Sequence, residues 1–496
     1  MRRVLTILFL SISVLSMASV PPRDPSKWVE WQERYASSTQ SISRARVPAA
    51  TRSDVERTII PRVAVIMVNF ADYELVSTKE EVDSMFNGRH WTKDDAKGSV
   101  RQYFCDQSMG QYDPQFDIFG PVTLSKGYAY YGKNNAVHST ANVGFMVTEA
   151  CTLVDDEVDF SQYDSDNDGK VDLVFVFFAG FGENDPPTGL VPSDKDLPWP
   201  HFWNIEAAGY GSNQHVFDGK SIYAYEISNE LDGYYTTATQ NVIAGIGVVC
   251  HEYCHGLGLP DLYAVGTEST HKLHGKWDIM DYGPYNDDMH SPPSFSAYER
   301  FFMGWLTPTL IIEPDTLTLS HIATTNEAYL IAENDKHNLD GVHPDTTVFY
   351  LLENRQQKGW DIDVPGEGLL MTRINFQPSL WNDNHVNSDP TNIGVDLIEA
   401  DGDTPSINKK DGKWGKAGDL FPFGATEYMG IPNHAITDIT MDDGIVRFVY
   451  RGGKTPTPVG FVSIAKDSEV NKIIRDGQMI IEYNGVYYNI LGNKLY

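Results

Sequence analysis

The sequence predicts an α+β fold of mixed type, in which an α/β domain is followed by a β-rich, sandwich-like domain. Two apolar runs, residues 63–70 and 171–178, have the length and composition of buried strands. A long apolar run over residues 241–257 predicts a buried helix that stops at a glycine. After Trp305, short β-prone runs alternate with Asn, Asp, Gly and Pro, a pattern typical of a sandwich.

The chain of 496 residues is too long for one ordinary domain, and its composition changes along its length. The expected organisation is a signal peptide (1–18), a pro-segment or N-terminal arm (19–58), an α/β domain (59–308), the β-rich domain (309–451) and a C-terminal β tail (459–496).

The N-terminus has the features of a cleaved export signal. A basic start precedes the apolar run 4–15, and small residues stand at positions 16 and 18. The apolar run is short for a membrane span, although an uncleaved anchor is the alternative. No later stretch of the sequence is long and apolar enough to cross a bilayer. The protein is therefore expected to be secreted or held at the cell surface.

Charge and cysteine content narrow the functional classes. Asp and Glu number 68 against 38 Lys and Arg, which gives a formal net charge of -30. Such a surface repels nucleic acid and anionic lipid, so neither is expected as a main partner. Four cysteines are few for a disulfide scaffold. A Cys105–Cys151 bridge and buried free thiols both remain open.

The C-terminal region consists of a predicted linker and a small β module. Residues 452–458 are rich in Gly, Pro and Thr, and Asn484-Gly485 is a strong hairpin turn signal. Residues 470–496 resemble the short C-terminal sorting regions of exported proteins from type IX-secreting bacteria. An accessory β module for substrate or surface binding is the alternative.

The strongest chemical signal is the run HEYCH, from His251 to His255, on the predicted helix. A spacing of four places the two imidazoles about 40° apart, so both can bind one metal ion. Glu252 lies about 80° from the midpoint of that pair, close to a metal-bound water. Zinc lowers the pKa of such a water to about 7, and a carboxylate can accept its proton. The motif therefore predicts zinc-dependent hydrolysis with Glu252 as general base.

The residues after this motif favour Asp261 as the third metal ligand. Gly258 and Asp261 follow the second histidine by three and six positions, which is the metzincin layout. Met280 matches the Met-turn that lies beneath the metal in that layout. Glu299 is the rival ligand, in a layout where a downstream helix supplies a glutamate. Tyr282 could contact the zinc or stabilise an oxyanion through its phenol, or serve only in packing.

Long stretches around these motifs resemble one known family. The runs are VRQYFCDQSMGQYDPQFDIFGPVTL (100–124), GIGVVCHEYCHGLGLPDLY (245–263), WDIMDYG (277–283) and FSAYERFFMGWL (295–306). Together they resemble the immune inhibitor A family of secreted bacterial metallopeptidases. The likeness covers roughly residues 63–306, and extends more loosely to the run LENR at 352–355.

The resemblance implies a metzincin-like zinc endopeptidase that hydrolyses protein or peptide substrates. It implies zinc binding by His251, His255 and Asp261, with Glu252 as the base and Met280 in the Met-turn. The sequence departs from the family at Cys254, where a small or apolar residue is expected, and in its short pro-segment. The alternatives are a catalytically idle relative that binds protein or surface polymer, and another type of zinc hydrolase, such as an amidase.

A second cluster of acidic residues predicts a structural calcium site. It has carboxylates at alternate positions and a glycine at the sixth, as at the start of an EF-hand loop. The expected calcium residues are Asp164, Asp166, Asp168, Lys170 and Asp172. Phe175 stands where an EF-hand requires glutamate, so other residues would have to complete the site. A solvated acidic turn is the alternative.

Overall fold

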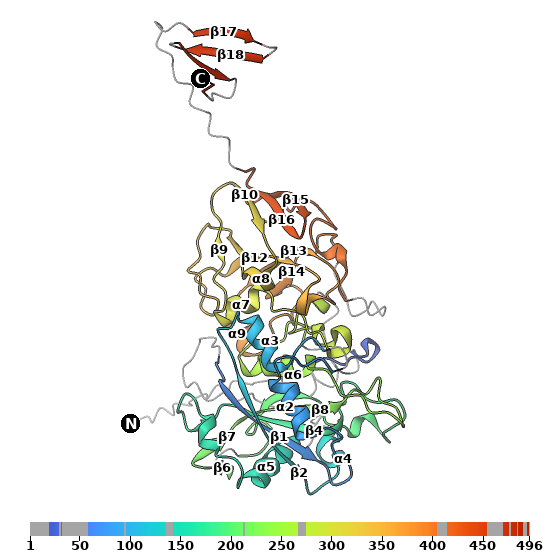
Figure 1. The fold of residues 1–496 in the computed structure, drawn as a ribbon. Coiled ribbons are helices and arrows are strands. Elements are labelled where there is room, and N and C mark those ends of the chain that lie inside the picture. Colours follow the sequence, from blue (N-terminus) through green and yellow to red (C-terminus); the bar gives the residue numbers. More distant parts are fainter. Residues whose placement is uncertain are drawn as a thin grey trace, which may run out of the picture. The chain divides into compact units, whose positions relative to one another are not determined.

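The structure is a computed structural model that forms two compact units, residues 1–451 and 452–496 (Figure 1). It describes residues 19–28, 31, 58–93, 96–134, 142–211, 214–265, 274–403, 414–453, 470–475, 478–483, 485–489 and 494–495. The predicted signal peptide, most of the predicted pro-segment and most of the linker lie outside the described residues. The boundary predicted near residue 309 falls inside the first unit and stays a prediction.

The first half of this unit is built on a five-stranded sheet in the order β2-β1-β4-β8-β5. Its strands are β2 (Gln115–Thr123), β1 (Arg62–Asn69), β4 (Val174–Phe181), β8 (Ala224–Leu231) and β5 (His201–Asn204). The first four are parallel to one another, and the edge strand β5 is antiparallel to β8. Strands β1 and β4 are buried on both faces, which explains why both predicted strand segments are almost uniformly apolar.

Helices cover both faces of this sheet. Alternate residues of β1 and β4 pack on one side against α2 (Lys79–Asn87), α3 (Val100–Gln107) and α6 (Gly247–Gly256). Those between them pack on the other side against α5 (Val143–Val154). Cys105 lies on α3 and Cys151 on α5, so the sheet separates them. All four cysteines are free.

Helix α6 begins six residues later than the apolar pattern predicted. Ile243 forms a bridge with Leu231, and Ala244 N–H donates to the Glu230 carbonyl. This stretch therefore pairs with the end of β8 instead of forming a helix. A Cβ atom on Gly245 would lie 2.2 Å from the Met289 carbonyl oxygen. The approach of this neighbouring loop, which sequence periodicity does not report, determines where the helix starts.

The second half of the unit contains two sheets that share a hydrophobic core. One has the order β14-β13-β12-β11-β9 and the other β10-β16-β15. Their bounds are β9 (Thr309–Leu310), β10 (Asp315–Leu319), β11 (Tyr329–Ala332), β12 (Val348–Arg355), β13 (Gly368–Asn375), β14 (Val395–Leu397), β15 (Ile436–Asp442) and β16 (Ile445–Tyr450). Residues on the other face of the larger sheet belong to the same core as α3 and α6. The two halves are therefore packed together.

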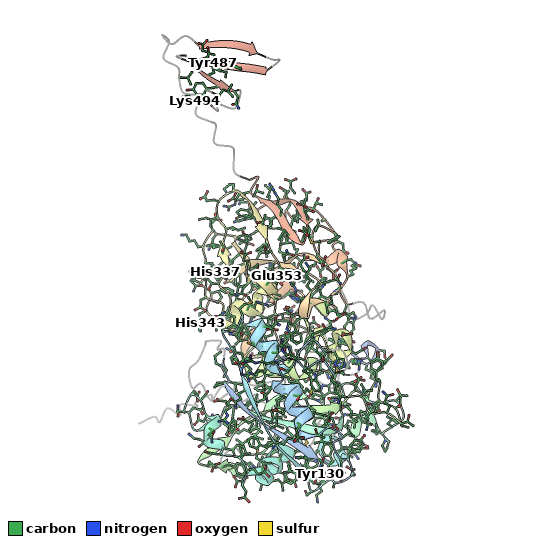
Figure 2. All side chains as sticks on the ribbon, viewed as in Figure 1. Tyr130, His337, His343, Glu353, Tyr487 and Lys494 are labelled. Carbon is green, nitrogen blue, oxygen red and sulfur yellow. The ribbon has the colours of Figure 1, made fainter. Side chains whose placement is uncertain are left out.

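Smaller elements join this framework. They are α4 (Tyr128–Gly132), α7 (Ala297–Met303), α8 (Ile322–Thr325), α9 (Pro378–Asn382), β3 (Lys170–Val171), β6 (Val216–Phe217) and β7 (Lys220–Ile222). Figure 2 shows side chains over the whole described chain, with the exposed Tyr130 of α4 labelled. Among the described residues, no helix combines the length and the apolar character that crossing a membrane requires.

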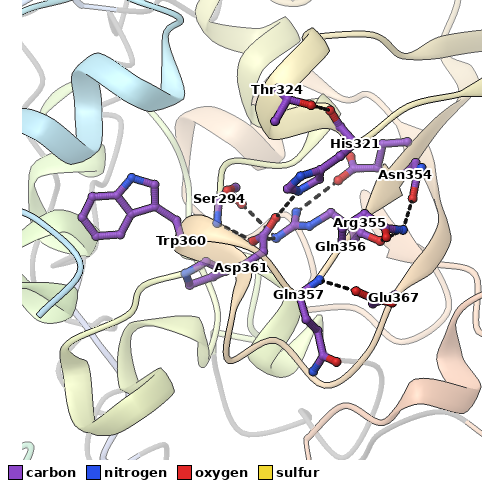
Figure 3. A network of polar contacts seen from close by, with 12 residues as sticks. Ser294, His321, Thr324, Asn354, Arg355, Gln356, Gln357, Trp360, Asp361 and Glu367 are labelled. Atoms are coloured by element: carbon purple, nitrogen blue, oxygen red, sulfur yellow. Dashed lines mark hydrogen bonds and ion pairs between the residues drawn. The ribbon is translucent and has the colours of Figure 1, made fainter. Parts of the chain in front are cut away.

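A buried polar network at the end of β12 connects the two halves of the first unit (Figure 3). The Arg355 guanidinium lies 2.7 Å from Asp361 and 3.1 Å from Glu353. It also donates to the Ser294 carbonyl at 3.1 Å, while Ser294 N–H donates to Asp361 at 2.8 Å. A further bond, of 3.3 Å, reaches the Trp277 carbonyl, just before the predicted Met-turn. The β-rich half thus helps to hold a loop of the candidate site.

The second unit is a three-stranded antiparallel sheet of β17 (Val470–Arg475), β18 (Gln478–Tyr483) and β19 (Val486–Asn489). Gly485 has a φ of +75° in the turn between β18 and β19, as the Asn-Gly signal predicted. Leu495 N–H donates to the carbonyl of Tyr487, the tyrosine labelled in Figure 2.

Candidate active site

Helix α6 and the turn after it bring three potential metal ligands together. Nε2 of His251 and Nε2 of His255 lie 3.3 Å apart. Asp261 Oδ1 lies 3.3 Å from the first nitrogen and 3.1 Å from the second. The carboxyl group is fully buried and the imidazoles nearly so. The residues that the spacing singled out therefore form one compact triangle of donor atoms.

The hydrogen bonds of the imidazoles show which nitrogen atoms are available to a metal. His251 Nδ1 lies 2.7 Å from the Ile279 carbonyl, and His255 Nδ1 lies 2.9 Å from the Leu259 carbonyl. A carbonyl accepts only from a protonated nitrogen, so Nδ1 carries the proton, and in the neutral imidazole Nε2 keeps a lone pair for the metal. Such bonds orient metal-binding histidines.

This triangle fits a zinc ion. In tetrahedral zinc sites with bonds of 2.0–2.1 Å the ligand atoms lie about 3.3 Å apart, close to the distances found here. Asp261 Oδ1 receives no hydrogen bond from another group of the described chain, although it is buried. Three lone-pair atoms at this spacing repel one another unless a cation lies between them.

A residue far away in the sequence fixes the orientation of Asp261. Asn384, which follows α9, donates to Asp261 Oδ2 at 2.5 Å and accepts from Asp261 N–H at 2.7 Å. Oδ1 is thereby left to face the histidines. Sequence reasoning missed Asn384, because 123 positions separate it from Asp261 and no motif surrounds it.

The turn between the helix and Asp261 has the expected form. Gly258 has a φ of +103°, a conformation that a residue with a Cβ atom adopts only under strain. Met280 is fully buried, and its carbonyl accepts from Leu262 N–H at 2.8 Å. The rival ligand Glu299 caps α7, where it accepts from Ser296 N–H at 2.6 Å.

Glu252 lies beside the triangle, with ligand-type atoms of the two histidines within 4.8 Å of its carboxylate. Both of its oxygens accept backbone hydrogen bonds. Val20 N–H donates to Oε1 at 2.7 Å, and Phe202 N–H of β5 donates to Oε2 at 2.9 Å. Burial raises the pKa of Glu252 well above its usual value, while the two amides oppose that rise.

The contact from Val20 belongs to an N-terminal segment, residues 19–23, of which residues 19–22 are buried. Trp199 Nε1–H donates to the Val20 carbonyl at 3.0 Å. The hydroxyl of Tyr263 donates to the Ser19 carbonyl, and that of Tyr285 donates to the Pro21 carbonyl. No sequence pattern predicts these aromatic contacts, because the three side chains come from separate loops.

Tyr282, singled out as a possible oxyanion stabiliser, also contacts the N-terminal segment. Its hydroxyl donates to the Arg23 carbonyl. Its ring packs against Trp414 at a centroid distance of 4.1 Å and against Tyr285 at 5.0 Å. The packing that the sequence suggested is therefore present, whereas a contact of the phenol with zinc or an oxyanion stays a prediction.

The predicted calcium loop gathers three of its five residues. Carboxylate oxygens of Asp164, Asp166 and Asp172 lie within 4.8 Å of one another. Burial, more than its acidic neighbours, raises the pKa of Asp172 to about 6. Lys220 Nζ lies 2.5 Å from Asp164 and partly compensates the negative charge. Asp168 and Lys170 contribute an ion pair of 4.0 Å to the edge of this loop.

Comparison with known proteins shows that the half of the chain that carries this site is similar to known metallopeptidases. The family model described as the immune inhibitor A peptidase M6 catalytic domain matches residues 62–306. The pre-pro-metalloprotease PrtV of Vibrio cholerae serotype O1 (strain M66-2) is 26% identical over 251 residues, covering 47% of this chain and 26% of PrtV. Immune inhibitor A of Bacillus thuringiensis subsp. alesti is 25% identical over 283 residues, covering 49% and 39% of the two chains. The chain thus spans well under half the length of these relatives.

Proposed function

Because the chain belongs to the immune inhibitor A-like family of metallopeptidases, we propose that it is a secreted zinc-dependent endopeptidase with Glu252 as general base. The observation that carries this proposal is the buried triangle of His251, His255 and Asp261, whose lone pairs converge at 3.1–3.3 Å. Bound there, zinc would act as a Lewis acid and lower the pKa of a water molecule.

The protein's own residues supply the proton transfers. Glu252 would accept a proton from the attacking water and then donate it to the nitrogen of the leaving amine. Its burial favours the protonated form that this second step requires. Phe202 N–H holds Oε2 at 2.9 Å and so leaves Oε1 as the oxygen for proton transfer. Tyr282, once its hydroxyl is released from Arg23, is proposed to stabilise the oxyanion of the substrate carbonyl.

We propose that residues 19–23 keep this peptidase latent, in line with the pro-segment expected from the sequence. Val20 N–H donates to Oε1 of Glu252, so the bound segment competes with an attacking water for this oxygen. The same residues are buried where a substrate would approach. Displacement or cleavage of the segment would activate the enzyme.

The localisation rests on the two ends of the chain and is also a proposal. The export signal at residues 1–18 would direct secretion, and the C-terminal sheet would serve as a sorting region. Truncation after Lys454 is then expected to preserve proteolysis but to abolish sorting, measured by fractionation of the producing cells. Normal surface retention of the truncated protein would refute the sorting role.

The central test replaces Glu252 by alanine after activation by limited proteolysis. The variant is expected to retain zinc, because the ligands remain, and to lose casein hydrolysis by roughly 10²–10⁴-fold. Zinc is measured by elemental analysis and hydrolysis by release of labelled peptides. Unchanged hydrolysis in this variant would contradict the role of Glu252. An activated wild-type protein that binds zinc but cleaves nothing would support the idle relative instead.

A further inference from the structure

We propose that Asp185, Asp232 and Asp288 form a subsite of the substrate cleft that binds an arginine side chain of the substrate. Arg23 of the N-terminal segment occupies this pocket and acts as a stand-in for that side chain. The inference rests on the proposed peptidase function and specifies its substrate class, namely peptides that carry arginine at a fixed distance from the reacting bond.

Most contacts to the N-terminal segment involve its main chain. The carbonyls of residues 19, 20, 21 and 23 accept from side chains of the catalytic half, and Arg23 N–H donates to the Asn184 carbonyl at 2.9 Å. Contacts of this kind hold any extended peptide, whatever its sequence. The cleft therefore binds the segment as it would bind a polypeptide substrate.

Arg23 is the exception, because its side chain is recognised by charge. Nη1 lies 2.8 Å from Asp232 and 3.0 Å from Asp185, and Nη2 lies 2.6 Å from Asp288. The rings of Tyr234 and Tyr235 lie 5.1 Å and 5.5 Å from the guanidinium carbon. A planar group with several donors matches this arrangement, whereas a lysine ammonium could not make all of these contacts.

The pocket is held in place by its own backbone, independently of Arg23. Asp232 Oδ1 accepts from the N–H groups of Tyr234 and Tyr235, both at 2.8 Å, which leaves Oδ2 for the guanidinium. Gly233 N–H donates to Asp185 at 2.9 Å. A Cβ atom on Gly233 would lie 1.8 Å from the Asp185 carbonyl oxygen, so only glycine allows this approach.

Once the N-terminal segment leaves, the negative charges of the pocket favour binding of another cation in place of Arg23. Three carboxylates surround one guanidinium, and the side chain of Asp232 is fully buried. Without Arg23 these carboxylates would repel one another in a partly dehydrated pocket. The exposed side chains of Tyr234 and Tyr235 lie beside the guanidinium. An arginine from a substrate would replace the contacts that are lost.

The position of the pocket relative to Glu252 defines how far the substrate arginine lies from the reacting bond. Arg23 is three residues after Val20, whose N–H contacts Glu252, so an extended chain separates the two points by roughly 10 Å. A substrate bound in the same way would place arginine three residues from the residue whose amide meets the general base.

The first test uses methylguanidinium and does not depend on catalysis. In full-length Arg23→Ala the pocket is vacated, so millimolar methylguanidinium is expected to raise the melting temperature. It should leave the wild-type protein unchanged, because Arg23 already fills the site. Arg23→Ala combined with Asp288→Asn, a half-exposed position that folding is expected to tolerate, should lose most of the gain. Absence of a shift in Arg23→Ala would overturn the pocket as a guanidinium site.

The second test measures cleavage by full-length Arg23→Ala. Peptide pairs differ only in arginine or its neutral isostere citrulline, moved one position at a time along the sequence. We expect kcat/KM to be about tenfold or more higher for arginine at one fixed position, because charge-assisted hydrogen bonds are lost with citrulline. Asp288→Asn in the same background should reduce this preference.

The two tests separate the possible failures. Methylguanidinium binding without any preference for arginine in cleavage would overturn the substrate subsite and leave Arg23 as a latch of the N-terminal segment. Methylguanidinium binding with no peptide cleavage by any activated form would contradict the peptidase function, and the subsite with it.

Discussion

The ligand triangle is buried and the arginine pocket is partly exposed at Asp288. One N-terminal segment contacts the pocket and Glu252 beside the triangle, but the two sites are built differently. The triangle comes from eleven consecutive residues, His251 to Asp261. The pocket takes its three carboxylates from positions 185, 232 and 288, in three separate loops. A site built on one helix and its following turn can be predicted from spacing, whereas a site assembled from distant loops cannot.

The two sites also differ in what neutralises them. The pocket already holds its cation, because Arg23 supplies a guanidinium from within the chain. Among the described residues, no Lys or Arg forms an ion pair with Asp261, and its Oδ1 faces only the two histidines. The arginine pocket can therefore bind a ligand only after Arg23 is displaced, whereas the ligand triangle needs a metal ion from outside the chain.

The largest effect is expected from a substitution that removes one ligand of the triangle. Asp261→Ala should lose most of its zinc, because only two of the three ligands of the triangle remain. Glu299→Ala is the matched control, since this buried carboxylate caps α7 instead of facing the histidines. Zinc content of the two purified variants, measured by elemental analysis, decides between them. Retention of zinc by Asp261→Ala with loss from Glu299→Ala would overturn the ligand assignment.

A smaller effect is expected from replacing Asn384, the residue that orients the ligand Asp261. Asn384→Ala should weaken zinc binding by about 10–100-fold, since groups that orient metal ligands have effects of this size. Competition with a chromophoric chelator measures the affinity. Asn375→Ala is a suitable control, because its amide contacts Asn392 in the same half of the protein. Equal zinc affinity in both variants would show that Asn384 does not position Asp261.

The link between the two sites is tested by Arg23→Ala without added ligand. Loss of charge-assisted bonds of 2.6–3.0 Å should release the N-terminal segment and raise basal proteolysis about tenfold or more. Lys27→Ala, which removes only an exposed ion pair with Asp194, should leave it unchanged. Basal cleavage of a fluorogenic peptide by unprocessed protein is the measurement. Identical rates in all three proteins would contradict latency through this segment.

The smallest expected effect concerns the acidic loop at residues 164–172. Like the arginine pocket it joins three carboxylates to one cationic side chain, here Lys220. We expect millimolar calcium to raise the melting temperature by a few degrees, and Asp166→Asn with Asp168→Asn to reduce that gain. A melting curve indifferent to calcium in both proteins would leave the loop as an acidic turn neutralised by Lys220.

The fold shows the same division between local and distant causes. The apolar run at 63–70 predicted β1 to within one residue, and the run at 171–178 placed β4 three residues too early. Both runs indicated strands because strands buried on both faces need apolar residues throughout. The start of α6 was predicted six residues too early. Glycines 245 and 247 fit against carbonyls of Met289 and Pro284, and those contacts exist only in the folded chain.

The sequence alone predicted the family, which comparison with known proteins confirms. It also predicted the residues around which a metal site would form. Helical periodicity fixes the two histidines on one face, and Gly258 allows the turn that returns Asp261 to them. The tertiary structure alone decided that Asn384 orients this ligand, that Val20 N–H covers Glu252, and that Arg23 meets three carboxylates. These contacts join residues more than a hundred positions apart, and no local pattern encodes which distant loops will meet.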